Sequence, residues 1–110
     1  MLVVDADKVK EEDVLMEEAK GTTIQILINR PPAPNFIMRR FRIKPNGYTP
    51  LHSHDFEHEV YVLQGVGEVL NNKHRYAIKS GSVIYIPPNE VHQFRNVGEE
   101  DLVFLCIIPA

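Results

Sequence analysis

The chain has 110 residues, of which 44% are hydrophobic and 25% are charged, so it is long enough for one domain with a single modest core. Its net charge of −3 gives no electrostatic basis for binding nucleic acid, and its one cysteine excludes an intrachain disulfide. No segment approaches the roughly 20 apolar residues of a membrane span, and no signal peptide is visible, so we expect a cytoplasmic protein.

Residues 1–20 are acidic and only weakly periodic, which is compatible with a short helix or an irregular N-terminal arm. From residue 21 to residue 110, short β-branched and apolar runs alternate with turn residues. The expected strands cover 22–29, 36–44, 58–65, 67–70, 74–79, 82–86, 92–97 and 101–108. A turn is expected at Pro45-Asn46-Gly47, and Asn71-Asn72 suits a two-residue hairpin loop with positive φ. This spacing of strands predicts an all-β sandwich or barrel over 21–110.

Four of the five histidines fall in two short segments. His52, His54 and His58 lie in HSHDFEH, and their even spacing puts them on one face of an extended strand. His92 lies far along the chain and joins them only through the fold. Neutral imidazole is a common ligand of divalent first-row metals, so these four residues predict one metal site.

The two histidine segments resemble the two motifs of the cupin superfamily. In the first motif His52-x-His54 is followed by three residues, His58, six residues and Gly65. The second motif is matched by Gly81, Pro87, Asn89, His92 and Asn96. The short interval between Gly65 and Gly81 is typical of compact microbial cupins.

The sequence departs from this pattern at three positions. Asn46 and Asn89 stand where the motifs have glycine, and asparagine tolerates left-handed backbone. His58 stands where the first motif has glutamate. A shift of register by one residue would make Glu59 the motif glutamate, but Glu59 falls on the strand face opposite His54. We favour His58 as the fourth ligand and keep Glu59 as the alternative.

The resemblance implies a small jelly-roll barrel that holds a metal ion inside, and frequent homodimers. The all-histidine variant looks like the small manganese- or iron-binding cupins. Four neutral ligands leave an octahedral ion two open positions, which suits manganese or iron, while zinc, nickel and copper stay open. Apolar residues on both faces of 22–29 and 58–65 also favour a homodimer, because both faces need cover.

Strand parity predicts the wall of the cavity. In strand 36–44 the polar face, with Arg40 and Arg42, is expected to meet solvent, so Arg39 points inward. A buried arginine needs an anion, which is either a substrate carboxylate or enolate, or an internal glutamate. Phe94 shares the parity of His92, and Phe104 and Cys106 share one face of the last strand. These side chains either line the cavity or pack in the core, and Cys106 is a further candidate ligand.

The leading functional hypothesis is a metal-dependent oxidoreductase of the dioxygenase type acting on a small organic substrate. The alternatives are a metal-dependent isomerase or lyase of sugars or keto acids, and a non-catalytic module that binds a small ligand. The sequence contains no Ser-His-Asp set, phosphate-binding glycine loop or CxxC motif, so the metal site is the single candidate centre. The expected partners are a small-molecule substrate and a second copy of the chain.

Overall fold

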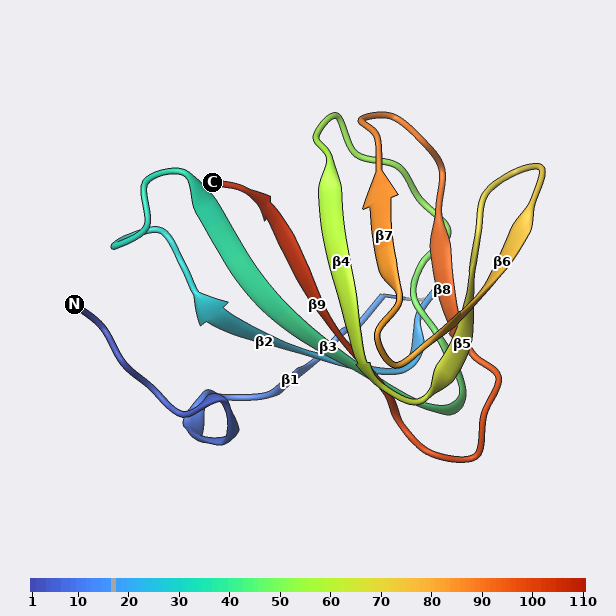
Figure 1. The fold of residues 1–110 in the computed structure, drawn as a ribbon, viewed down its shortest axis with the longest axis horizontal. Coiled ribbons are helices and arrows are strands. Elements are labelled where there is room, and N and C mark those ends of the chain that lie inside the picture. Colours follow the sequence, from blue (N-terminus) through green and yellow to red (C-terminus); the bar gives the residue numbers. More distant parts are fainter. Residues whose placement is uncertain (17) are drawn as a thin grey trace.

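Antiparallel strands form nearly all of the regular secondary structure of the computed structural model, which describes residues 1–16 and 18–110 (Figure 1). A single 3-10 turn, η1 (Ala6–Lys8), precedes strands β1 (Glu12–Asp13), β2 (Lys20–Ile28), β3 (Phe36–Tyr48), β4 (His58–Gln64), β5 (Val66–Leu70), β6 (Arg75–Lys79), β7 (Val83–Ile86), β8 (Gln93–Asn96) and β9 (Leu102–Pro109). Glu17, within the predicted arm, lies outside the described residues. No helix among the described residues is both long and apolar enough to cross a membrane.

The strands form one curled sheet in the order β6-β5-β8-β3-β9-β4-β7, with β2 beside β3 and β1 beside β2. The curl brings the two ends of this order toward each other and gives the predicted small jelly-roll barrel (Figure 1). Strand β3 is central, because it pairs with β2 and β9 along most of its length and with β8 at Tyr48. It therefore joins the two halves of the curled sheet.

The predicted turn at Pro45-Asn46-Gly47 is wrong, because β3 continues through these residues as a bulge. The register against β2 shifts there: Thr22 faces Ile43, whereas Lys20 faces Tyr48. Asn46 adopts the left-handed conformation with φ of 68°, which absorbs the extra residues. A Cβ atom on Gly47 would lie 2.6 Å from the Lys20 carbonyl oxygen, so only glycine fits. The bulge redirects β3 from β9 toward β8.

The two-residue hairpin predicted at Asn71-Asn72 is also wrong. The loop spans residues 71–74, and the Asn71 side-chain oxygen accepts hydrogen bonds from the backbone N–H groups of Lys73 (2.9 Å) and His74 (2.8 Å). Asparagine thus closes the turn through its side chain rather than through a positive φ. In the described chain the non-glycine residues with positive φ are Asn46 and Asn89, the two at motif glycine positions.

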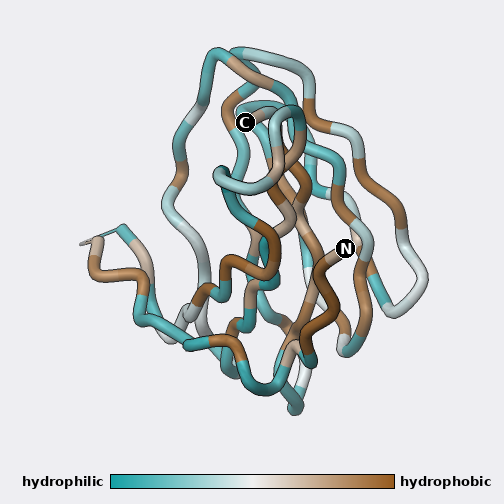
Figure 2. The backbone as a smooth tube through the Cα atoms, turned by 90° about the vertical axis from the view of Figure 1, so that its left-hand side faces the viewer, coloured by the Kyte–Doolittle hydropathy of each residue, from teal (hydrophilic) through white to brown (hydrophobic). Residues whose placement is uncertain are grey.

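The core lies inside the barrel and is built from alternate residues of the strands. Its fully buried side chains are Ile43, Val62, Leu102 and Phe104. Strand β4 shows the alternation clearly, since Val60 and Val62 are buried whereas Tyr61 and Leu63 are exposed. In Figure 2 the backbone changes repeatedly between hydrophobic and hydrophilic colours, as expected for strands that bury every second side chain.

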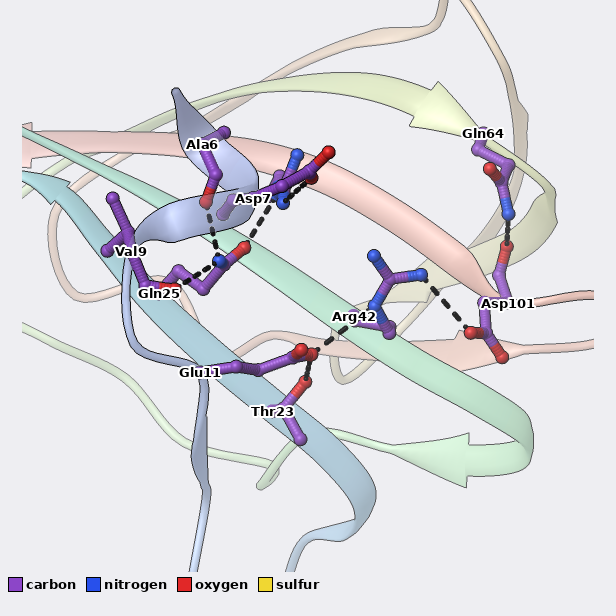
Figure 3. A network of polar contacts seen from close by, with 10 residues as sticks. Ala6, Asp7, Val9, Glu11, Thr23, Gln25, Arg42, Gln64 and Asp101 are labelled. Carbon is purple, nitrogen blue, oxygen red and sulfur yellow. Dashed lines mark hydrogen bonds and ion pairs between the residues drawn. The ribbon is translucent and has the colours of Figure 1, made fainter. Parts of the chain in front are cut away.

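The N-terminal arm packs against the outer face of β2 and β3 (Figure 3). The buried Gln25 side chain donates hydrogen bonds to the backbone oxygens of Ala6 (2.9 Å) and Val9 (2.8 Å) and accepts one from Arg40 (2.7 Å). Arg42 pairs with Glu11 at 3.3 Å. The expectation that Arg40 and Arg42 face solvent is therefore wrong, because the arm covers them.

We expect Asn96→Ala to lower the free energy of unfolding. The buried Asn96 side chain donates to the backbone oxygens of Ile43 and Glu100 and accepts from Gly98 N–H, each at 2.8 Å. At about 1 kcal/mol for each lost hydrogen bond, the substitution costs about 3 kcal/mol. Urea denaturation measures the change, with the exposed Asn72→Ala as control. Equal stability of the two variants would contradict this role.

Candidate metal centre

Backbone hydrogen bonds join the two histidine segments at one end of the barrel. His52 and His92 form an isolated antiparallel bridge, in which His52 N donates to His92 O at 3.2 Å and His92 N donates to His52 O at 2.9 Å. Asn89 N donates to the carbonyl oxygen of His54 at 2.6 Å. His58 is the first residue of β4, and its backbone pairs with Ile86. Residues far apart in sequence are thus brought together by the backbone.

Three of the four predicted ligands bring ring nitrogens close together, and His58 is not in this group but lies beside it. The ring nitrogens of His52, His54 and His92 lie within 4.8 Å of one another, so these three residues could hold a metal ion. The ring centre of the buried His58 lies 4.8 Å from that of His92 and 5.2 Å from that of His54. Glu59 is exposed and lies on the opposite face of β4.

The histidines are neutral at physiological pH, as metal ligands must be. Burial, reinforced by His54, His92 and Arg39, lowers the pKa of His52 to about 4. Burial, with His92 and Arg39 adding to it, lowers the pKa of His58 to about 3. Burial also lowers the pKa of His54 and of His92.

The hydrogen bonding of two ring nitrogens shows whether the histidines can act as metal ligands. His92 Nδ1 lies 2.9 Å from the Glu90 carbonyl oxygen, which only accepts, so this nitrogen carries the proton and Nε2 keeps its lone pair. His58 Nδ1 is buried and has no hydrogen-bond partner among the described residues. A buried nitrogen without a partner is costly, and a metal ion would satisfy it in this all-imidazole set. The donor set therefore fits a divalent metal.

A cavity of about 340 Å³ opens beside the histidines. Its lining consists of Val14, Met16, Thr22, Ile24, Arg39, Phe41, Thr49, Pro50, His52, His54, His58, His92, Phe94, Phe104 and Cys106. Phe104 stacks on Phe41 at 5.3 Å and on Phe94 at 4.5 Å, so three phenyl rings make a continuous apolar wall. None of the described lining residues is acidic.

All the side chains predicted for the pocket lie in this lining, namely Arg39, Phe94, Phe104 and Cys106. Among the described residues, no ion pair includes Arg39. Arg39 instead donates a hydrogen bond to Cys106 Sγ at 2.9 Å. Sequence reasoning missed Val14 and Met16, because the weak periodicity of the arm does not show where it packs.

Comparison with known proteins identifies one family. The profile of the Cupin domain family matches residues 39–108. The solved structure of the polyketide cyclase RemF from Streptomyces resistomycificus is 36% identical, with a TM-score of 0.92, over 99% of this chain and 79% of that chain.

Two curated relatives match a shorter part of the chain. The oxalate-binding protein of Thermotoga maritima is 34% identical over 73 residues, which are 66% of this chain and 60% of that protein. The 1-methylthio-D-xylulose 5-phosphate methylsulfurylase of Rhodospirillum rubrum is 33% identical over 73 residues, 66% of this chain and 47% of that protein. The matches thus span about half of these relatives' length.

Proposed function

The chain belongs to the cupin family, and on this premise we propose that it is a metal-dependent enzyme acting on a small, flat, apolar substrate with an enolisable carbonyl group. His52, His54, His58 and His92 would hold one divalent ion, with manganese or iron favoured. The observation that carries this proposal is the cavity in which the histidines meet a wall of three stacked phenyl rings. Such a wall suits the planar body of an aromatic substrate.

The lining argues against a sugar as substrate. Sugar hydroxyl groups need many polar partners, and burying them without hydrogen bonds is costly. Each of the two threonine hydroxyls at this cavity already has a partner in the protein: Thr22 Oγ1 donates to Tyr48 O at 2.9 Å, and Thr49 Oγ1 accepts from Phe94 N at 2.9 Å. The isomerase of sugars that the sequence left open is therefore not the function we propose.

The proposed enolate chemistry follows from the histidines and phenyl rings that line the cavity. A divalent ion held by the four histidines would polarise a carbonyl oxygen of the substrate and so acidify the neighbouring C–H group, whose proton would pass to water in the cavity. Phe94 and Phe104 would hold the substrate body beside the histidines. The hydrogen bond between His92 Nδ1 and Glu90 O fixes the tautomer of His92. Its Nε2 therefore keeps the lone pair that would bind the ion. This arrangement supports enolate chemistry, of which ring closure of a polyketide, the activity in the name of RemF, is one example.

Oxygen-dependent cleavage of an enol, the dioxygenase reaction predicted from sequence, is the second candidate. The neutral donor set favours it, because four imidazoles suit redox-active iron and leave two open positions for substrate and oxygen. Both reactions begin with a polarised carbonyl group. They differ in whether oxygen is consumed.

One experiment separates the two reactions. Metal-loaded protein is incubated with 1-tetralone in D₂O, while deuterium at the α carbon is followed by NMR and dissolved oxygen by an electrode. We expect accelerated exchange without oxygen uptake. Oxygen uptake in proportion to substrate loss would establish the dioxygenase instead. No acceleration and no uptake would contradict both and favour a module that only binds ligands.

We also propose that the protein is a homodimer formed through the outer face of β4 and β7. Tyr61, Leu63, Val83 and Tyr85 on this face are 50%, 41%, 76% and 61% exposed. Tyr61 and Val83 are direct cross-strand partners, so the apolar side chains form one patch. A second copy is the occupant we propose for this patch.

Sedimentation tests the dimer. The wild-type protein should sediment at twice the chain mass of 12.6 kDa, and Val83→Glu should halve that mass because it places a charge in the interface. Lys73→Glu, in the exposed loop 71–74, is the control and should remain dimeric. A single wild-type species at the chain mass at micromolar concentration would contradict the proposal.

A further inference from the structure

Arg39 is a positive charge inside an otherwise apolar part of the cavity. It projects from β3, where its backbone neighbours are Ile26 of β2 and Cys106 of β9. Its guanidinium carbon lies 5.0 Å from the centre of the Phe41 ring, and Nη2 donates to Cys106 Sγ at 2.9 Å. It thus lies in the lining that also contains the four histidines.

The contacts of Arg39 within the described chain do not neutralise its charge. A thiol is a weak hydrogen-bond acceptor, and burial raises the pKa of Cys106, so its sulfur is uncharged at neutral pH. Nε is buried and has no hydrogen-bond partner among the described residues. A guanidinium keeps its charge under all physiological conditions and presents five N–H donors. Within the described chain, the one hydrogen bond of this side chain is the one to Cys106, so most of its donors have no partner there.

A bound metal ion would add to the positive charge of Arg39 that no described residue neutralises. The four histidines are neutral, so the charge of a divalent ion would add to that of Arg39 in one cavity. None of the described lining residues supplies a negative charge. A charge of this kind is costly to keep away from water unless an anion meets it. An anion that occupies the cavity would supply the negative charge that the described lining lacks.

We infer that Arg39 is a specificity-determining anion site, and that the substrate is an aromatic or flat apolar molecule carrying a carboxylate or phenolate group. This inference rests on the proposed function and adds the charge of its substrate. The guanidinium would bind the anionic oxygens, while the phenyl rings of Phe41, Phe94 and Phe104 hold the apolar body. Neutral analogues of the same shape would bind more weakly, because they leave the buried guanidinium without an anionic partner.

The test compares two probes of the same shape, 2-naphthoate and 2-naphthamide, titrated into the purified protein by calorimetry. The wild-type protein should bind 2-naphthoate at least about tenfold more tightly, the ratio that 1.4 kcal/mol of binding free energy produces. Arg39→Met, which keeps the length of the side chain, should abolish this preference and leave the affinity for 2-naphthamide unchanged. Arg75→Met, at an exposed position on β6, is the matched control and should behave as wild type.

The same variants report whether Arg39 is merely structural. If it only stabilised the fold, Arg39→Met would lower the melting temperature. We expect the melting temperature to rise instead, because a buried charge without an anion is removed. Arg39→Gln gives a second neutral variant if the methionine does not fold.

The outcomes of this test distinguish a failure of the proposed anion site from a failure of the proposed metal centre. An unchanged preference for 2-naphthoate in Arg39→Met would overturn the inference, because the carboxylate would then be bound elsewhere. Absence of binding of either probe to the wild-type protein would overturn it as well. A preference that depends on Arg39 in protein that holds no metal would support the anion site and contradict the metal centre. Metal content is measured on the same samples.

Discussion

Replacing His58 by alanine should reduce metal affinity by more than about 100-fold, the upper end of the loss caused by removing an outer-shell partner of a metal site. The reason is that His58 is buried beside His54 and His92, and its Nδ1 has no other partner in the described chain. Glu59→Ala should leave metal affinity unchanged, because that side chain is exposed on the opposite face of β4. Competition titration against a chelator measures both affinities.

This pair of adjacent substitutions also decides the register of the first motif. Both lie on the same strand, so a general effect on β4 would appear in both variants. Loss of metal from Glu59→Ala with retention in His58→Ala would make Glu59 the ligand and reverse our assignment. Circular dichroism of both variants checks that the barrel is intact.

Phe104→Ala should lower the free energy of unfolding by about 3–5 kcal/mol, the usual cost of deleting a buried phenyl ring. Phe104 is 1% exposed and stacks on Phe41 and Phe94, so no neighbour can fill the space without losing its own contacts. The substitution should also weaken binding of aromatic probes, since the middle of the apolar wall is lost. Urea denaturation and probe titration measure the two effects.

Phe36→Ala is the control for this prediction. Phe36 is the same residue type at the start of β3, but its side chain is 68% exposed. Its replacement should change the stability by less than about 0.5 kcal/mol, as for most surface positions. Similar losses in the two variants would show that the stacked rings do not form the core of the barrel.

Most of the fold was predictable because period-two alternation and turn residues mark strands directly. The strand bounds agree with the structure within one or two residues except at the end of β3. There, the residues Pro45-Asn46-Gly47 predict a turn, although the same residue types also form a bulge. Local sequence does not distinguish the two, because the difference depends on whether β2 and β8 lie alongside.

The site was predictable for a different reason. The spacing of His52 and His54 predicts a shared face of an extended strand, and the cupin motifs relate them to His92. The strand is wrong, because both histidines lie in the segment before β4, where His52 forms an isolated bridge. The structure adds the backbone bridge between His52 and His92, which links the two segments. It also adds Val14 and Met16 of the arm to the cavity. Their place depends on hydrogen bonds of Gln25 to backbone oxygens, which carry no side-chain signature.

The arm connects the outside of the barrel to the cavity. Gln25 of β2 and Arg42 of β3 hold the arm through hydrogen bonds and an ion pair (Figure 3). Farther along the arm, Val14 N donates to Thr22 O at 3.0 Å. Val14 and Met16 lie in the lining, so the arm forms part of one side of the cavity.

The central claim is that four histidines hold one divalent metal ion, and the X-ray absorption spectrum of the bound metal in natively purified protein tests it most directly. The edge energy identifies the metal, and multiple scattering from imidazole rings counts the histidine ligands. We predict one ion bound by four imidazole nitrogens, with the other ligands supplied by water or substrate. A sulfur ligand from Cys106, a protein carboxylate in the coordination sphere, or protein that is purified without metal and still turns over substrate would contradict the claim.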